Sequence, residues 1–332
     1  MIHRLCLASL GSIVLLGFGQ AAWSAEGPVV LDKNPYIESL GDLARNPDYE
    51  TQGEYAGAAG EKKFGIQVIA RGDGKYDAVL FPGGLPGSGS DGKTKIALKG
   101  ETKDGVVHLQ GDQWTATITS GVLSAKGPEA VELKKVYRVS PTMGAKPVEG
   151  AVVLFDGTSV QGWNNVKLED GNLLGIGGRT KAKFHNFTLH LEFRSPFQPT
   201  KTGQARGNSG MYLLDQYECQ ILDSFGLNGE NNECGGFYTI QKPNVNMCLP
   251  PMSWQTYDVD FTAAKFDAAG KKTANAVVTM RQNGVLIHDK FELPRNTPGG
   301  GTLDESQPAP LFLQNHGDAV RFRNIWAVEH KS

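Results

Sequence analysis

Apolar and polar residues alternate in short runs along most of this chain, and turns rich in glycine and proline separate the runs. In the segment Phe187–Arg194, phenylalanine and leucine alternate with Thr188, His190 and Glu192. A period of two residues is typical of a β-strand that buries one face. Hardly any segment shows the period of an amphipathic helix. The sequence therefore predicts an all-β protein.

The first half of the chain reads as a small β-rich unit of its own. Its predicted strands are Lys63–Ala70, Tyr76–Phe81, Lys95–Lys99, Val106–Gln110, Gln113–Thr119 and Val131–Val139. Residues 34–50 show a mixed pattern that could include a short helix. Residues 141–150 contain two prolines and two glycines between strand patterns, which favours a linker. We therefore expect a β-rich accessory domain at 26–140, a linker at 141–150 and a second domain at 151–332.

The second half predicts a larger antiparallel structure. Its predicted strands are Phe187–Arg194, Gly210–Leu214, Tyr217–Leu222, Gln255–Phe261, Ala276–Gln282, Val285–Lys290, Pro310–Gln314 and Val320–Glu329. The dipeptide Asn283-Gly284 between two of them is a strong hairpin signal. Many antiparallel strands with long intervening loops predict a two-sheet jelly-roll sandwich.

The N-terminus has the features of an export signal. A short basic start at residues 1–4 precedes the apolar stretch Leu5–Phe18 and a small-residue region that ends near Ala25. This pattern predicts a cleaved signal peptide at residues 1–25 and a periplasmic or secreted mature chain. No later run is apolar enough to span a bilayer, so no integral membrane segment is expected in the mature chain. A formal net charge of -2 without a dense basic cluster gives little support to nucleic-acid binding.

The cysteines suggest one crosslink. Cys6 lies in the signal, which leaves Cys219, Cys234 and Cys248 in a compartment where disulfides persist. Cys219 falls in a strand pattern and is expected to pack as a small buried hydrophobe. Cys234 and Cys248 lie in turn-rich sequence, where a disulfide would staple a long loop. We therefore predict a Cys234–Cys248 disulfide.

Polar groups interrupt the β-prone stretch from Arg206 to Ser224 at short intervals. In an extended strand Glu218 and Gln220 share one face, and one bulged residue after Gln220 would bring Asp223 to that face too. Acid/base work on a sugar needs two ionisable groups that flank one bond. Solubilising charges on a surface strand would give the same pattern, and the strand alone leaves both interpretations open.

Motifs in the second half resemble those of a known family. They are F-D-G-T-S near Phe155, F-T-L-H-L-E-F-R, G-N-S-G-M-Y, Y-E-C-Q-I-L-D-S, W-Q-T-Y-D-V-D-F, Q-N-G-V-L-I-H-D and L-Q-N-H-G-D-A-V-R-F-R-N-I-W. Together they resemble the 3-keto-disaccharide hydrolase family from about Val152 to Glu329. The resemblance implies a concanavalin A-like, glucanase-like jelly roll. Residues 26–140 fall outside it and look like a companion domain.

The resemblance implies cleavage of glycosidic bonds in sugars already oxidised at C3. The ketone acidifies the C2 hydrogen, so a base can form an enolate that expels the C1 aglycone, and water then adds to the enone. Direct acid-assisted hydrolysis is the other route, and the sequence does not separate the two. A sugar 3-dehydrogenase would have to act upstream to supply the ketone.

Site residues follow from the resemblance as hypotheses. Catalytic candidates are Glu218, Asp223 and His316, the last because histidine titrates near neutral pH. Candidates for substrate binding are Arg206, Asn208, Tyr212, Gln220, Tyr238 and Gln314.

Each of these hypotheses has a structural alternative. Glu218 could form an ion pair with Arg206, Arg206 and Asn208 could serve a turn, and His316 could be plain surface. An ion pair with Glu192 is the expected role of Arg323, and His185, His190 and His288 are read as structural.

No cofactor follows with certainty. His316, Asp318, Glu218 and Asp223 would suit a divalent cation that polarises the ketone, although no spacing demands one.

Other functions remain open at this stage. A lectin-like carbohydrate-binding module would keep aromatic and amide groups but would not need converging acids. A laminarinase-type hydrolase would need two close carboxylates, and Gln220 stands where such strands carry an acid. An adhesion role would also fit an exported β-rich chain.

Overall fold

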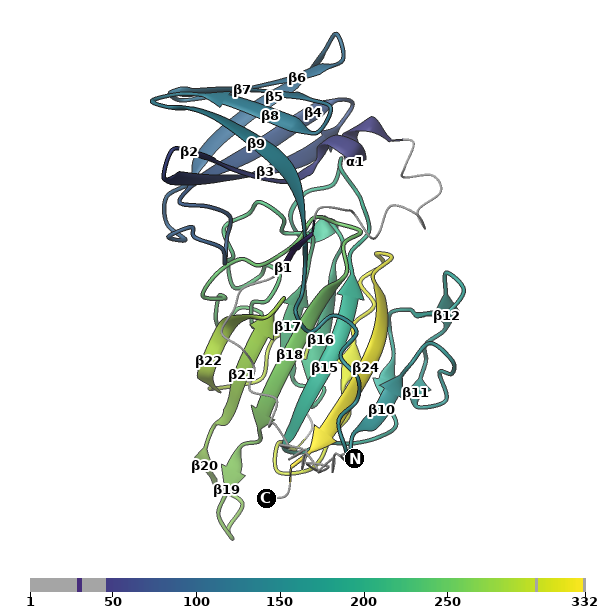
Figure 1. Cartoon of the computed structure of the whole chain (residues 1–332). Helices are drawn as coiled ribbons and strands as arrows, with labels where there is room; N and C mark the ends of the chain where they lie inside the picture. The colour runs from purple at the N-terminus through teal and green to yellow at the C-terminus, as the bar shows by residue number, and fades with distance from the viewer. Residues whose placement is uncertain (1–28, 32–45, 302–303, 331–332) are drawn as a thin grey trace, which may run out of the picture.

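The computed structural model describes residues 29–31, 46–301 and 304–330, so the signal predicted at 1–25 lies outside the described residues. Helices in the described part are α1 (Pro47–Thr51) and the 3-10 turn η3 (Gly203–Ala205), and nearly all other regular structure is antiparallel β. The strands form two bodies joined by residues 140–150 (Figure 1).

The N-terminal body is a closed antiparallel barrel. Its strands are β2 (Gly53–Ala59), β3 (Lys62–Gly72), β4 (Lys75–Pro82), β5 (Ile96–Lys103), β6 (Val106–Gly111), β7 (Trp114–Thr119), β8 (Val122–Lys126) and β9 (Ala130–Val139). β9 pairs with both β2 and β8, which closes the barrel, and β1 (Val29–Leu31) pairs with the end of β9. Closure leaves these eight strands without a free edge.

Side chains fill the barrel. Along β7, Trp114, Ala116 and Ile118 point inward and are buried, whereas the threonines between them are exposed. The inward residues form a hydrophobic cluster separate from that of the second body. Strands β2 and β8 were not among the predicted strands, because the glycines and alanines of β2 and the shortness of β8 weaken the alternation signal.

The second body is a sandwich of two antiparallel sheets, as the sequence predicted. The larger sheet contains β10 (Val152–Phe155), β12 (Leu168–Glu169), β13 (Leu173–Leu174), β15 (Phe187–Arg194), β18 (Gln255–Thr262), β21 (Ala276–Gln282), β22 (Val285–Leu293) and β24 (Arg321–Glu329). The smaller sheet contains β11 (Trp163–Asn164), β14 (Arg179–Thr180), β23 (Phe312–Leu313), β16 (Ser209–Leu213) and β17 (Tyr217–Ile221). A short ribbon, β19 (Lys265–Phe266) with β20 (Lys272–Ala274), extends from the larger sheet.

The Asn283-Gly284 hairpin forms where the sequence predicted it. Gln282 pairs with Val285, and Asn283 and Gly284 have φ of 51° and 79°. Two successive residues with positive φ make the turn that matches the twist of paired strands. The turn therefore fixes the register of β21 against β22.

The sandwich core lies between the two sheets. Phe193 of β15 is fully buried, and its ring centroid lies 4.6 Å from that of Tyr257 on β18. Met211 and Cys219 of the smaller sheet belong to the same hydrophobic cluster as these two rings. Truncation of such a buried phenylalanine to alanine costs about 3–5 kcal/mol.

The three described cysteines are free and buried, so the prediction of a Cys234–Cys248 disulfide is wrong for this structure. The Cys234 thiol lies 3.2 Å from the Tyr257 hydroxyl and accepts a hydrogen bond from Gln282 Nε2 at 3.3 Å. The Cys248 thiol donates to the Leu222 carbonyl at 3.5 Å. The turn-rich segment between them is thus held by burial and polar contacts, which the sequence pattern did not reveal.

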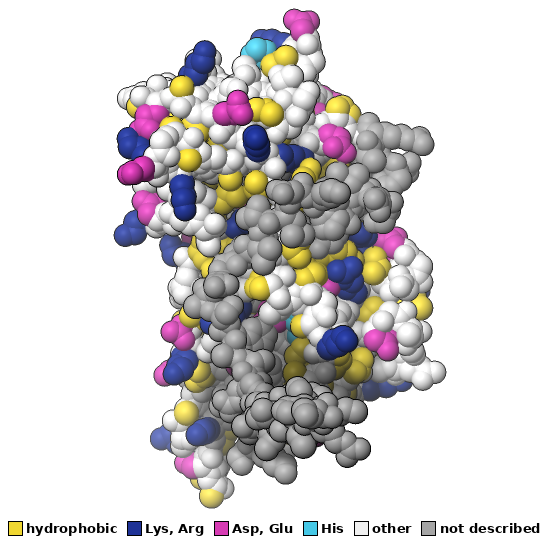
Figure 2. Space-filling view, in the orientation of Figure 1, with side chains coloured by type: hydrophobic (Ala, Val, Ile, Leu, Met, Phe, Trp, Pro, Cys, Tyr) yellow, Lys and Arg dark blue, Asp and Glu magenta, His cyan; other side chains and the backbone are white. Residues whose placement is uncertain are grey.

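Charged side chains are mixed on the surface. On the face shown in Figure 2, lysines and arginines alternate with acidic residues and do not gather into one field. No helix among the described residues is long and apolar enough to cross a bilayer.

Candidate active site

Polar side chains gather on the outer face of the smaller sheet. Met211 and Cys219 point into the core, so their neighbours Tyr212 and Glu218 point to the opposite face. Tyr212 and Glu218 lie directly across from each other on paired β16 and β17. The alternation predicted for Glu218 and Gln220 is confirmed, because the core residue Cys219 lies between them.

Glu218 is a buried carboxyl without a charged partner. Its residue is 3 % exposed, and burial raises its pKa to about 7 although a hydrogen bond with Tyr212 works against the shift. None of the ion pairs among the described residues includes Glu218, so the predicted alternative of a pair with Arg206 is wrong. A carboxyl with such a pKa exchanges protons readily at neutral pH.

Tyr212 links Glu218 to Gln314. Gln314 Nε2 donates to the Tyr212 hydroxyl at 3.1 Å, and burial together with the nearby Glu218 raises the pKa of Tyr212. The phenol therefore stays neutral and can donate to the Glu218 carboxylate. Gln314 is set just beyond β23 by its backbone N–H, which donates to Gly210. Its side-chain oxygen has no partner among the described residues.

Three amide side chains form a second part of this face. Gln220 Nε2 donates to Gln204 Oε1 at 3.0 Å and to Asn208 Oδ1 at 3.2 Å. Asn208 Nδ2 in turn donates to the Gln204 carbonyl at 2.8 Å. The Gln220 side-chain oxygen is buried and has no described partner. Buried polar atoms without partners are costly and often mark places where a ligand binds.

Asp223 forms a buried ion pair with Arg206 instead of joining Glu218. Arg206 Nε lies 2.6 Å from Asp223 Oδ2, and both side chains are nearly inaccessible. Strand β17 ends at Ile221, and the Asp223 N–H donates to the Arg206 carbonyl at 3.1 Å. Arg206 Nη2 has no described hydrogen-bond partner. The pair therefore leaves one donor group of Arg206 unused.

His316 stands apart from both carboxyls. It is exposed in the turn after Gln314, and no described hydrogen bond or ion pair joins it to Glu218 or Asp223. The neighbouring Asp318 is buried and accepts hydrogen bonds from Gln198 Nε2 at 2.8 Å, Lys201 Nζ at 3.0 Å and the Asn208 N–H at 2.8 Å. Burial opposes these bonds, which nevertheless lower the pKa of Asp318.

The four residues considered for a cation are not arranged as a metal site. Within the described part of the chain, no group of three or more histidine, cysteine or acidic side chains could hold a metal ion. Asp318 is committed to an amide, an ammonium and a backbone N–H. A hollow of about 410 Å³ adjoins it, lined also by Asn315, Lys167 and Arg321.

Loop residues that the sequence analysis did not select complete the site. Thr297 Oγ1 accepts the Glu218 N–H at 2.8 Å and donates to the Gln216 carbonyl at 3.1 Å. Gly299 lies against the Tyr212 hydroxyl, so this segment covers the Glu218 side of the face. Tyr238 is half-buried and contacts Glu218 through its backbone N–H. Gln204 lies in the short 3-10 turn η3 and Thr297 in an irregular segment, where no periodicity could have identified them.

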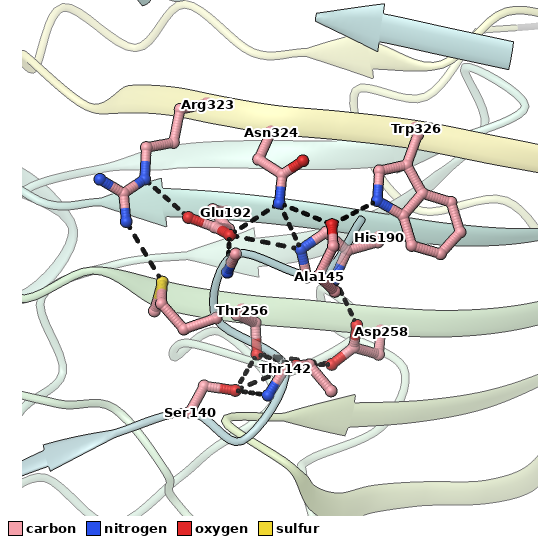
Figure 3. A network of polar contacts seen from close by, with 12 residues as sticks. Ser140, Thr142, Ala145, His190, Glu192, Thr256, Asp258, Arg323, Asn324 and Trp326 are labelled. Atoms are coloured by element: carbon pink, nitrogen blue, oxygen red, sulfur yellow. Dashed lines mark hydrogen bonds and ion pairs between the residues drawn. The ribbon is translucent and has the colours of Figure 1, made fainter. Parts of the chain in front are cut away.

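A second polar cluster lies on the outer face of the larger sheet (Figure 3). His190 Nδ1 lies 2.6 Å from Asp258 Oδ1, and its Nε2 lies 3.5 Å from Glu192 Oε1. Arg323 Nε lies 2.6 Å from Glu192 Oε2, which confirms the predicted ion pair. Asn324 Nδ2 also donates to Glu192, at 2.9 Å.

The linker covers this second cluster. The Gly144 N–H donates to Glu192 at 2.6 Å, and Thr142 Oγ1 donates to Asp258 at 2.6 Å. The Ala145 carbonyl accepts hydrogen bonds from Asn324 Nδ2 at 3.0 Å and Trp326 Nε1 at 3.1 Å. Residues 142–145 are therefore fixed to the sandwich and are not a free connection.

Charges in the second cluster balance one another. Burial disfavours the charged form of His190, but its bonds to Asp258 and Glu192 outweigh burial and raise its pKa to about 9. Burial likewise opposes ionisation of Glu192, yet its bonds to His190, Asn324 and Arg323 lower its pKa to about 2. These groups remain charged and paired at neutral pH, which supports the structural reading of His190.

Comparison with known proteins places the sandwich in a family. Residues 150–328, more than half of the chain, match the model of the 3-keto-alpha-glucoside-1,2-lyase-like domain. The chain belongs to this family. No curated protein matches it.

The chain is also similar to solved structures. A protein of Parabacteroides distasonis, provisionally assigned as a glycosyl hydrolase, shares 32 % identity over 55 % of this chain and 84 % of its own, with a TM-score of 0.50. A second such protein of that organism shares 19 % identity over 55 % of this chain and 95 % of its own, with a TM-score of 0.41. The family and the first of these structures indicate a glycosyl hydrolase-like enzyme with a carbohydrate substrate.

The family match sharpens the contrast between the two polar clusters. Both clusters lie within residues 140–328, but only the cluster around Glu218 combines a proton-exchanging carboxyl with unpartnered amide atoms. On this geometry the Glu218 cluster is the candidate active site. The barrel lies outside the matched residues.

Proposed function

We propose that this chain is an exported enzyme that cleaves the glycosidic bond of 3-keto-glycosides, with Glu218 as its acid/base group. The observation that carries the proposal is the uncompensated carboxyl of Glu218, whose pKa is raised to about 7 by burial. Acid/base catalysis is most effective when the pKa of the group lies near the working pH. Export rests on the sequence of residues 1–25.

Glu218 would act on the carbon next to the ketone. Its carboxylate takes the C2 proton, electrons move into the C2–C3 bond to form the enolate, and collapse of the enolate breaks the C1–oxygen bond. The leaving oxygen takes a proton, and water then adds at C1 of the enone while C2 regains a proton. Tyr212, a neutral phenol, is hydrogen-bonded to Glu218 and can hold the carboxylate in place.

Unpartnered atoms around Glu218 suit a sugar. The side-chain oxygens of Gln220 and Gln314 can accept hydrogen bonds from sugar hydroxyls, and Arg206 Nη2 can donate to a ketone or enolate oxygen. Because the segment with Thr297 and Gly299 covers Glu218, substrate binding requires that segment to shift.

The state of Asp223 favours elimination over direct hydrolysis. Hydrolysis with retention uses two free carboxyl groups about 5 Å apart. Of the two candidate carboxyls, Asp223 is held in an ion pair with Arg206, and Glu218 has no cation partner among the described residues. This arrangement also speaks against a laminarinase-type mechanism. A lectin-like module would bind sugars without needing a carboxyl of raised pKa.

The test compares a chromogenic aryl glucoside with its 3-keto counterpart, using purified mature protein with and without a chelator. We expect aglycone release from the keto sugar alone. A deuterium at C2 should slow that release if elimination is correct, whereas direct hydrolysis would show no primary isotope effect. Binding of sugars without any release would instead support the lectin-like function, and loss of activity with chelator would reveal a required metal.

A further inference from the structure

One loop of the sandwich contacts the barrel on one side and the candidate active site on the other. This coupling loop, residues 195–207, carries Phe197, which packs against the hydrophobic cluster of the barrel. The Phe197 and Tyr49 rings meet edge to face with centroids 5.3 Å apart. Farther along, the Thr200 side chain lies against Gly72 at the end of β3. The barrel thus holds the outer side of the loop.

The inner side of the coupling loop bonds to the site. Gln198 and Lys201 donate to Asp318, and Asp318 accepts the Asn208 N–H. Gln198 Oε1 also accepts the Gly207 N–H at 2.8 Å. Gln204 is the hydrogen-bond partner of the amides of Asn208 and Gln220 on the Glu218 face. Gln198, Lys201 and Gln204 therefore link the loop to Asp318 and to the amides of the Glu218 face.

The barrel contacts a second loop of the site as well. Ile69 of β3 packs into the core of the sandwich and lies against Gly226. Lys95 Nζ donates to the Leu227 carbonyl at 3.1 Å and to Asn228 Oδ1 at 3.2 Å. The contacted residues, 226–228, follow Asp223, the partner of Arg206, in the sequence. The barrel therefore braces both segments that contain this ion pair.

We propose that the barrel is a positioning element of the active site and that Phe197 is the residue through which it orders the coupling loop. The family match begins at residue 150 and assigns no role to the barrel. The inference builds on the proposed function, because it names Asn208 and Gln220 as the residues to be placed.

The decisive variant is Phe197→Ala in the full chain. Phe197 is only partly buried, so the barrel should keep its fold while the loop loses its anchor. Backbone hydrogen exchange at Gly207 and Asn208 reads the loop directly, since both N–H groups are held by the contacts described above. We expect these two amides to exchange about tenfold faster. This measurement does not depend on any catalytic activity.

Activity on the keto-glucoside supplies the second measurement. Displaced binding groups typically reduce catalysis by about 10- to 100-fold, and we expect kcat/KM to fall within that range. Water that enters beside Gln220 should also reduce the burial of Glu218 and so lower its pKa. The midpoint of the pH dependence of kcat/KM should then lie below that of the wild type. Phe197→Leu, which keeps an apolar side chain in the barrel contact, should restore most of the activity.

Phe64→Ala is the matched control. Phe64 belongs to the same barrel cluster, but its ring contacts Trp114 with centroids 5.8 Å apart and makes no described contact with the coupling loop. The Phe64→Ala variant should have a lower melting temperature, but hydrogen exchange at Gly207 and the pH midpoint of kcat/KM should not change. If Phe64→Ala does not fold, Phe64→Leu serves as the control.

Unchanged exchange in Phe197→Ala, or equal changes in both alanine variants, would overturn the inference. If the wild type does not act on keto sugars, the proposed function fails, while the exchange experiment still decides whether the barrel orders the loop.

Discussion

The two outer faces of the sandwich carry buried polar clusters of opposite design. On the outer face of the larger sheet, His190 lies between Asp258 and Glu192, and Arg323 forms an ion pair with Glu192. On the smaller sheet, Glu218 is equally buried but has only the neutral Tyr212 beside it. The first cluster is closed by the linker, and the second leaves amide oxygens without partners.

Burial alone therefore does not distinguish a structural cluster from a catalytic one. A buried charge is tolerated when counter-charges and hydrogen bonds compensate it, and its pKa then moves so that it stays ionised. Such a group can neither give nor take a proton at neutral pH, as the pKa of about 2 for Glu192 illustrates. The uncompensated Glu218 can do both. The direction of the pKa shift thus separates the two glutamates.

The largest expected effect is that of Glu218→Gln on activity. The amide keeps the shape of the side chain but cannot exchange a proton, so release of aglycone from the keto sugar should fall by about 10²- to 10⁴-fold. The melting temperature should stay the same or rise, because an uncompensated carboxyl is removed. Steady-state kinetics and thermal unfolding check this together. Activity within twofold of wild type would remove Glu218 from the mechanism.

The same type of substitution should have the reverse effect in the other cluster. His190→Gln removes the cation between Asp258 and Glu192, and loss of one partner from a buried charged set typically costs about 3–5 kcal/mol. Denaturant unfolding should show this loss. At temperatures where the variant is folded, its activity should match that of the wild type. A stable variant with impaired catalysis would mean that the two clusters are not functionally separate.

The sequence predicted the sandwich well because its strands obey local rules. Phe187–Arg194 and Ala276–Gln282 have the predicted bounds, and Asn283-Gly284 turns where expected. The short strands β10 to β14 were not predicted, since two-residue pairings such as Trp163–Asn164 depend on distant partners. Closure of the barrel by β8 and β9 likewise depends on tertiary pairing.

The site was only partly predictable. Alternation placed Glu218 and Gln220 on one face, because the strand period fixes side-chain direction. It did not predict that Asp223, which follows the end of the strand, forms an ion pair with Arg206. Residues such as Gln204 reach the site through loop geometry, which has no sequence period. The sequence did predict that Cys234 and Cys248 lie close together, but their thiols interact as free groups and form no disulfide.

Both clusters should lose stability as pH rises, but in different pH windows. Glu218 has a pKa of about 7 in the folded protein, against a usual 4.5. Burial of its ionised carboxylate therefore costs no stability below pH 4.5. The cost grows between pH 4.5 and 7 and reaches about 3 kcal/mol at higher pH. His190 has a folded pKa of about 9 against 6.5, so its contribution is full below pH 6.5 and is lost as pH rises through 9.

Unfolding free energies measured from pH 4.5 to 9.5 test these windows. The stability gained in Glu218→Gln should increase between pH 4.5 and 7, and the loss in His190→Gln should shrink between pH 6.5 and 9. In the wild type, kcat/KM should rise with pH around 7 if the carboxylate of Glu218 is the base. A stability difference for Glu218→Gln that is flat with pH would show that its carboxyl titrates normally.

The smallest expected effect is that of His316→Ala, which decides whether the catalytic cluster extends beyond the sheet face. His316 is exposed and has no described bond to Glu218, Asp223 or Tyr212. Surface substitutions of this kind change stability by about 0.5 kcal/mol or less, and activity on the keto sugar should stay within about twofold of wild type. Asn315, the exposed residue next to His316, provides the matched control variant Asn315→Ala.

A loss of tenfold or more in His316→Ala alone would make the histidine a proton donor to the leaving oxygen. His316 makes no described contact with the site, but it could still reach the aglycone once substrate has displaced the segment around Thr297. The Glu218 cluster would then be one half of a catalytic pair that closes only on substrate.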